Sequence, residues 1–159
     1  MSMIEQLNST GTTDIDETQW LEELKKFTSE NNSESEFIGS DLPFKTAEAK
    51  KNFIMYLYKN IASSNDDLLY YTFWAIRLLL REQIEISLLT TNEFIDAVVK
   101  IFGNTSNENV RIEATKCLIN TCHHSTTLRS HFTKNGLGSI IEAGFETLFL
   151  QEVRFVICN

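Results

Sequence analysis

Ala75-Ile76-Arg77-Leu78-Leu79-Leu80 decides the fold of this chain, because the same pattern returns 39 residues later as Ala114-Thr115-Lys116-Cys117-Leu118-Ile119. The two stretches match in their small, basic and apolar positions. Around the first stretch, apolar side chains from Leu69 to Leu80 surround the helix axis almost completely, which indicates a central helix covered by neighbours on nearly every side. Two helical units of like design are therefore expected.

The partner helix of each unit repeats as well. At a shift of 43 residues, Val98 falls on Ile141 and Phe102 falls on Phe145. A period of about 40 residues is typical of armadillo and HEAT repeats, whose units must stack because none can bury its apolar face alone. The sequence therefore predicts an all-α fold, an armadillo/HEAT-like right-handed superhelix of stacked helical repeats.

Capping residues and apolar stripes bound the individual helices. The expected helices cover residues 46–63, 66–81, 90–103, 110–121 and 125–135, with a further one around 140–145. Asp66 or Asp67 is expected to cap the second of these, and Thr90 with Glu93 has the capping-box spacing for the third. Gly103 stands where a helix end commonly takes a left-handed residue.

Residues 1–44 form an acidic leader. They hold ten acidic residues against Lys25 and Lys26, whereas twelve acidic and twelve basic residues cancel in residues 45–159, so the leader accounts for the net charge of −8. Its Ser-, Thr-, Asn-, Asp- and Glu-rich stretches bury too little apolar surface to offset the entropy of ordering them, so most of it is expected to be disordered. The exception is one short helix, 17–28, with Asp16 as N-cap and an apolar face made of Trp20, Leu21, Leu24 and Phe27.

Two roles for the acidic leader stay open on the sequence. One is a solubilising tail, and the other is a shield over a basic groove elsewhere in the protein.

Composition excludes several classes of protein. Cys117, Cys122 and Cys158 are an odd number of cysteines with no secretory leader before them, so free thiols in a reducing compartment are expected. No apolar stretch approaches the about 20 residues needed to cross a bilayer, and no basic stripe could neutralise a nucleic-acid backbone. No spacing resembles a phosphate-binding loop. A cytoplasmic protein without a cofactor, a nucleic-acid partner or a membrane span is expected.

A third helical unit is expected to begin near the end of the chain. Val110-Arg111 recurs 43 residues later as Val153-Arg154. The apolar run Phe155-Val156-Ile157 then has nothing after it to pack on, although a solenoid needs a terminal repeat with a polar outer face. Residues 45–159 are therefore predicted to be the N-terminal part of a solenoid, truncated within its third repeat.

A candidate partner-binding groove follows from the central helices. Arg77 and Arg81 sit four residues apart, with Trp74 on the same stripe, and two guanidiniums are costly to bury unless an anion meets them. Lys116 and Asn120 stand 39 residues after the two arginines, so they occupy the same places in the next repeat. In a stacked solenoid this stripe would line the concave groove. The alternative, in which the arginines form structural ion pairs with Glu82, Glu85 or Asp67, stays open.

A thiol or metal site is the other chemistry that the residues suggest. Cys122, His123 and His124 follow Cys117, but positions 117 and 122 lie about 140° apart round an ideal helix and no second ligand pair is near. Cys117 is also a stripe residue, and a Cys-His nucleophile would lack an orienting third group. A metal site and a catalytic residue are therefore not expected.

A known family matches several of these stretches in the same order and at roughly the same spacing. The matching stretches are 75–82, 113–120, Asn135-Gly136-Leu137 and Val153-Arg154-Phe155. Together they resemble the synembryn family, cytosolic chaperones and guanine nucleotide exchange factors for the alpha subunits of heterotrimeric G proteins. The resemblance covers about residues 50–155 and leaves the acidic leader without a counterpart.

The resemblance implies an armadillo-like superhelix whose concave face captures the C-terminal helix of an alpha subunit, so that GDP leaves without any covalent catalysis. The groove residues that match by position are Arg77, Arg81 and Asn120, with Trp74 and Lys116 beside them. A monomeric cytoplasmic protein, recruited to the cell cortex, is the corresponding expectation. Family members continue through many more repeats, so exchange activity of this chain alone would be incomplete. A generic adaptor with the same solenoid is the alternative function.

Overall fold

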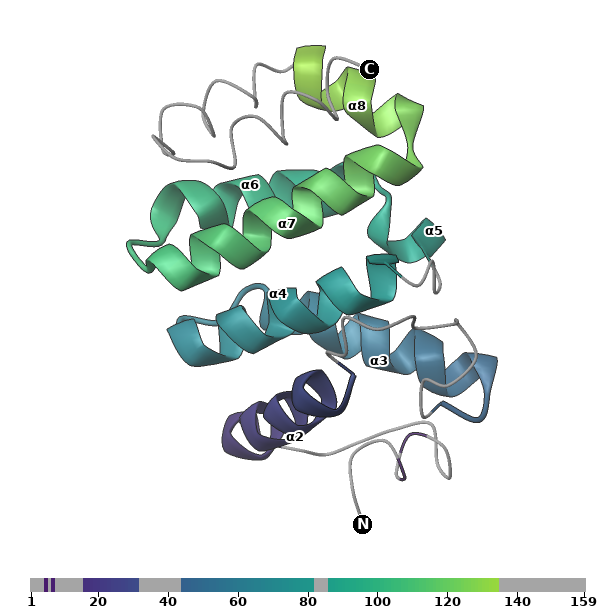
Figure 1. Cartoon of the computed structure of the whole chain (residues 1–159), viewed down its shortest axis with the longest axis vertical. Coiled ribbons are helices and arrows are strands. Elements are labelled where there is room, and N and C mark those ends of the chain that lie inside the picture. The colour runs from purple at the N-terminus through teal and green to yellow at the C-terminus, as the bar shows by residue number, and fades with distance from the viewer. Residues whose placement is uncertain (1–4, 6, 8–15, 32–43, 82–85, 135–159) are drawn as a thin grey trace. The chain divides into compact units, whose positions relative to one another are not determined.

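A computed structural model describes residues 5, 7, 16–31, 44–81 and 86–134 of the chain. Within these residues every regular element is a helix, and there are seven, α2 to α8 (Figure 1). The all-α prediction is therefore confirmed. Packing divides the chain into two compact units, Met1–Glu85 and Ile86–Asn159. The predicted helix around 140–145, the repeated Val153-Arg154 pair and Cys158 lie outside the described residues.

The first unit contains α2 (Glu17–Glu30), α3 (Ala47–Asn60) and α4 (Asp66–Arg81). Helix α4 packs against both α2 and α3 (Figure 1). Its buried side chains are Leu68, Leu69, Thr72, Phe73, Ala75, Ile76, Leu78, Leu79 and Leu80. The prediction of a central helix is confirmed for this unit, because apolar side chains on most sides of α4 need neighbours to cover them.

Helix α2 starts at the predicted residue and is packed into the first unit. Asp16 caps it, since its Oδ1 accepts a hydrogen bond of 2.9 Å from the backbone N–H of Gln19. Trp20, Leu24 and Phe27 are all buried. Burying a large apolar side chain stabilises by about 1.5–3 kcal/mol. The three side chains together therefore hold α2 firmly in place.

Aromatic contacts join α2 to α3. The Trp20 ring lies 6.3 Å from the Phe53 ring and 5.1 Å from the Tyr56 ring. Phe53 also lies 5.0 Å from Phe27, and Phe44 closes the cluster at 5.0 Å from Phe53. These ring separations are in the range of favourable aromatic pairs. Helix α2, the middle of α3 and Phe44 before α3 thus share one aromatic core.

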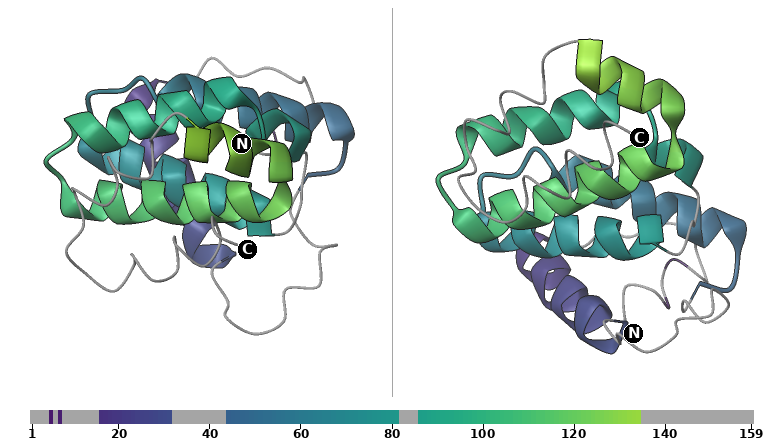
Figure 2. Two further views of the ribbon diagram at one scale, coloured as in Figure 1. Left: turned by 90° about the horizontal axis from the view of Figure 1, so that it is seen from above. Right: turned by 45° about the horizontal axis from the view of Figure 1, so that its top comes forward.

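The second unit contains α5 (Ile86–Leu89), α6 (Asn92–Asn104), α7 (Glu108–His124) and α8 (Thr126–Lys134). Helices α6, α7 and α8 pack against one another, and α6 and α7 run side by side in both views of Figure 2. Buried side chains of the three helices form the core of this unit: Phe94, Ile95, Val98, Phe102, Val110, Ala114, Cys117, Leu118, Leu128 and Phe132. The short helix α5 was not predicted.

Two predicted caps are wrong by one or two residues. Asn65, rather than Asp66 or Asp67, caps α4, because its Oδ1 accepts hydrogen bonds of 3.0 Å and 3.2 Å from the backbone N–H groups of Asp67 and Leu68. Thr91, rather than Thr90, caps α6 through a 3.1 Å bond from the backbone N–H of Phe94. In both cases adjacent residues have similar capping chemistry, and the backbone conformation decides between them.

Gly103 does not end its helix, which corrects a further prediction. It lies inside α6, which continues through Asn104 to a C-cap at Thr105 with φ of −79°. The N–H of Thr105 donates a 2.9 Å hydrogen bond to the carbonyl of Ile101, which satisfies an acceptor that a helix end leaves open. Arg111 binds the same turn, since its Nε donates a 3.0 Å bond to the Thr105 carbonyl.

Candidate partner-binding surface

One face of α4 carries the predicted stripe in the first unit. Tyr70, Trp74, Arg77 and Arg81 follow one another at helical spacing, so they share one face of the helix. Arg81 is exposed and the other three are half-buried, whereas most of α4 between Leu68 and Leu80 is buried. The predicted stripe is therefore the least buried face of α4, open to solvent or to a partner.

Arg77 lies over an aromatic ring of the same helix. Its guanidinium carbon is 5.9 Å from the centroid of the Trp74 ring, within the range of a cation–π contact. The indole N–H of Trp74 is buried and has no hydrogen-bond partner among the described residues. Tyr70 stands edge-on to the same ring at 5.6 Å. A planar cation beside an amphipathic ring suits an anionic ligand that also has an apolar surface.

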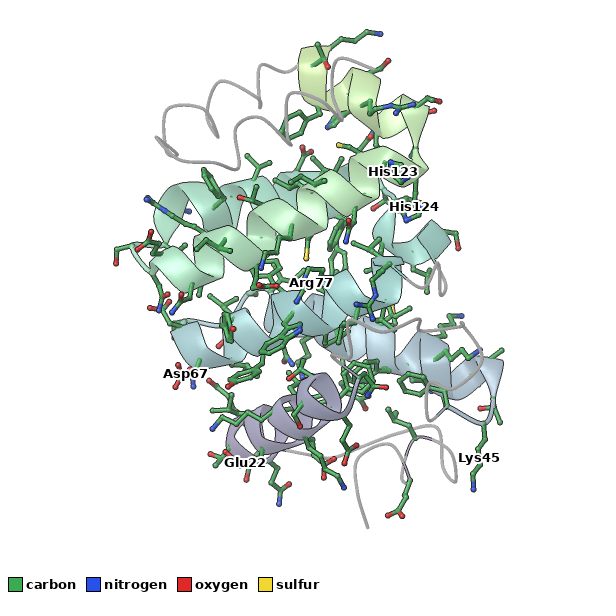
Figure 3. All side chains as sticks on the ribbon, viewed as in Figure 1. Glu22, Lys45, Asp67, Arg77, His123 and His124 are labelled. Carbon is green, nitrogen blue, oxygen red and sulfur yellow. The ribbon has the colours of Figure 1, made fainter. Side chains whose placement is uncertain are left out.

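Helix geometry excludes an ion pair between Asp67 and either arginine. Asp67 and Arg77 lie on one continuous helix, ten residues apart, as their labels in Figure 3 show. Ten residues of α-helix span about 15 Å, too far for these two side chains to meet, and Arg81 is farther still. Glu82 and Glu85 lie outside the described residues, so pairing with them stays a prediction.

Lys116 and Asn120 lie on α7 in the second unit, and both are half-buried. Lys116 Nζ is 2.7 Å from Glu113 Oε1, and the Glu113 side chain is only 5% exposed. A buried carboxylate is costly unless a cation neutralises it, so Lys116 has a structural task besides any contact with a partner. Sequence reasoning missed Glu113, although its spacing of three residues from Lys116 on a helix is the signal that could have found it.

The structure brings two of the five predicted residues into direct contact, Trp74 and Arg77, and helical geometry puts Arg81 on the same face. Lys116 and Asn120 belong to the other unit. A groove shared by all five residues stays a prediction.

Lys25 and Tyr71 are residues of this surface that sequence reasoning missed. Lys25 Nζ of α2 lies 6.0 Å from the Tyr71 ring centroid, and that ring stacks on Trp74 at 5.9 Å with an interplanar angle of 12°. A hydrogen bond from Lys25 Nζ to Glu22 Oε1, 2.8 Å long, raises the pKa of the Lys25 ammonium. No pattern in the sequence says that α2 packs on α4, so nothing pointed to this contact.

Cys117 and Cys122 are buried thiols of α7. Burial raises the pKa of Cys122 to about 11, against a weaker opposite effect of Arg129. Cys122 is therefore a protonated thiol at neutral pH. Nucleophilic attack and metal binding both need the thiolate, so this environment does not favour either role for Cys122. His123 and His124 lie next to each other near the end of α7 (Figure 3), with rings 5.5 Å apart. In the part of the chain that the structure describes, no three His, Cys, Asp or Glu side chains gather as metal ligands.

In comparisons with known proteins, no family model, no curated protein and no solved structure matches this chain. None of the described helices is both long and apolar enough to span a bilayer.

Proposed function

We propose that this chain is an interaction module of the synembryn type, which binds the alpha subunit of a heterotrimeric G protein. The proposed architecture is an armadillo-like superhelix in which the α4 and α7 faces line one concave groove. In the proposal the groove takes the C-terminal helix of the alpha subunit, and Arg77 and Arg81 bind its carboxylates while Asn120 bonds to its backbone.

The single observation that supports this proposal most is the least buried face of α4. Most side chains of α4 between Leu68 and Leu80 are buried, whereas Trp74 and Arg77 are half-buried and Arg81 is exposed on one shared stripe. Interface centres are enriched in Trp, Tyr and Arg, which supply most of the binding energy in many complexes. Guanidiniums also bind carboxylates through two parallel hydrogen bonds, which favours an acidic partner.

Nucleotide release would follow from binding alone. A groove that binds the detached C-terminal helix more tightly than the attached one shifts the alpha subunit towards the detached, nucleotide-free state. Each tenfold preference is worth about 1.4 kcal/mol in that equilibrium. No covalent step and no cofactor enter, and the same capture would account for a chaperone role towards nucleotide-free alpha subunits.

Fluorescence polarisation tests the proposal, with a labelled peptide that has the sequence of the C-terminal helix of the alpha subunit. Replacing both Arg77 and Arg81 by Glu should weaken binding at least about tenfold, because two attractive charges become repulsive. Arg81→Glu alone is the second variant, since Arg81 is exposed and its replacement leaves the buried core of α4 intact.

The matched control replaces Lys51 and Lys59 by Glu. Both lysines are exposed on α3 of the same unit, so the net charge changes equally while the α4 face stays as it is. Equal affinities of the control and the arginine variants would remove α4 as the site. No binding of the peptide by the unchanged protein, with capture of unrelated peptides instead, would favour the generic adaptor.

A further inference from the structure

A continuous row of rings and cations crosses from α2 to α4. Lys25, Tyr71, Trp74 and Arg77 follow one another with successive separations of 6.0, 5.9 and 5.9 Å. We call these four residues the cation–aromatic row. Each ring of the stacked pair therefore has a positive charge beside it, and all four side chains are half-buried.

Helix α2 holds its end of the row in a fixed position. Leu24, the residue before Lys25, is fully buried, and Trp20 and Phe27 are buried one turn to either side. Moving α2 away would expose all three apolar side chains to water, which is strongly unfavourable. The Lys25 charge is thus preorganised beside Tyr71.

The present partner of Lys25 can be exchanged at little cost. Glu22 is an exposed residue of the same helix, and its side chain is 68% exposed. Ion pairs between exposed side chains contribute little to stability, because water solvates both charges well. A carboxylate from a partner can therefore take the place of Glu22, or add to it, without disturbing the core of the unit.

We propose that the cation–aromatic row is one ligand surface, which binds a partner segment carrying an apolar side chain between two carboxylates. The apolar side chain would lie on the Tyr71 and Trp74 rings, while one carboxylate meets Lys25 and the other meets Arg77. This inference rests on the proposed function and deepens it, because it extends the α4 surface onto α2 and defines the partner segment by its charges.

Helix geometry gives the spacing to test. Carboxylates seven residues apart lie on one face of a helical peptide, about 10 Å apart along its axis, and the flexible Glu, Lys25 and Arg77 side chains allow each carboxylate to approach one cation. A synthetic helical peptide with Glu at both positions and Leu or Phe between them is the probe. The same peptide with Lys in place of both Glu residues is its control, and the alpha-subunit peptide is assayed beside them.

Lys26 provides a matched control on the protein side. It has the same charge, is adjacent in the same helix and is exposed, but it has no place in the row. Lys25→Glu should weaken binding of the Glu peptide about five- to tenfold at about 0.05 M salt, and by less than about twofold at about 0.5 M salt, as screening removes the effect. Lys26→Glu should stay within about twofold of the unchanged protein at both salt concentrations.

Trp74 supplies an independent readout. The chain has two tryptophans, Trp20 and Trp74, so a Trp20→Phe protein leaves the ring of the row as the sole tryptophan. Binding of the Glu peptide should change its emission, and Lys25→Glu should shift that titration to higher peptide concentration. Unchanged emission at saturating peptide would overturn the placement of the ligand on the row.

The possible outcomes separate the two proposals. If Arg81→Glu weakens binding of the alpha-subunit peptide while Lys25→Glu and Lys26→Glu behave alike, the row is wrong and the proposed function stands. If the Glu peptide binds in a Lys25-dependent way but the alpha-subunit peptide does not bind, the row stands and the proposed function is wrong. Failure of both peptides to bind overturns both.

Discussion

Phe27→Ala tests whether α2 is a structural part of the first unit. Phe27 is 1% exposed, and its ring lies 5.0 Å from Phe53 and 6.2 Å from Phe44. Truncating a buried Phe to Ala costs about 3–5 kcal/mol, because the apolar contact is lost and the site cannot collapse fully. Natural domains have only about 5–15 kcal/mol of stability. The variant should therefore lose a large share of the free energy of unfolding of this unit.

Urea unfolding followed by tryptophan emission is the assay. Both tryptophans, Trp20 and Trp74, lie in the first unit, so their emission reports that unit, whereas far-UV circular dichroism reports helices of both units. With a slope of about 2 kcal/mol per molar urea, a loss of about 4 kcal/mol lowers the emission midpoint by about 2 M. The dichroism trace should then split into two steps, because the second unit keeps its own core.

Two further variants of α2 calibrate the result. Phe27→Leu keeps a branched apolar side chain and should cost about 1 kcal/mol, so it stays measurable even if the alanine variant does not fold. Gln19→Ala changes an exposed residue of the same helix and should stay within about 0.5 kcal/mol. If Phe27→Ala shifts the urea midpoint from that of the unchanged protein no more than Gln19→Ala does, the reasoning is refuted. Helix α2 would then be only loosely attached to the first unit.

Three further predictions concern caps and a buried thiol. Asn65→Ala should cost about 1 kcal/mol by tryptophan emission, because it removes the acceptor of two N–H groups, while Asp67→Ala should cost only a few tenths. By the same reasoning Thr91→Ala should cost about 1 kcal/mol and Thr90→Ala almost nothing, measured by far-UV dichroism of urea unfolding; equal effects would place the cap elsewhere. Cys122 ionises near its ordinary pKa of 9.0 when unfolded but near 11 when folded, so the unfolded state binds fewer protons between these values and stability should fall as pH rises through them. The fall should be about 2 kcal/mol, and a fall of equal size in Cys122→Ala would show that other groups cause it.

Much of the helical pattern could be predicted from residue spacing. Trp20, Leu24 and Phe27 recur at helical spacing, and apolar residues cover nearly every side of α4. Such patterns can be recognised in the sequence without knowing which helices pack against them. Cap positions were less accurate. Asn65, Asp66 and Asp67 all offer a side-chain oxygen, and only the backbone conformation selects Asn65.

For the candidate site too, the sequence predicts which residues share a helix face but not which helices pack together. The spacing of Trp74, Arg77 and Arg81 on one face follows from helix geometry alone, so the sequence could place them together. Lys25 could not be placed there, because its contact with Tyr71 depends on which helix α2 packs against. Nor could burial of Glu113 be predicted, since a glutamate on a helix is normally solvated and only packing excludes water from it.

The sequence by itself determined that this chain is helical, where most of the helices lie and which side chains share a face, because these properties depend on interactions between residues a few positions apart. Only the tertiary structure decided that α2 completes the core of the first unit, that Lys25 faces the aromatic rings of α4, and that Lys116 neutralises a buried carboxylate. These features arise when surfaces distant in the chain exclude water from one another, and burial sets the energy of each charge and ring only after the helices have packed.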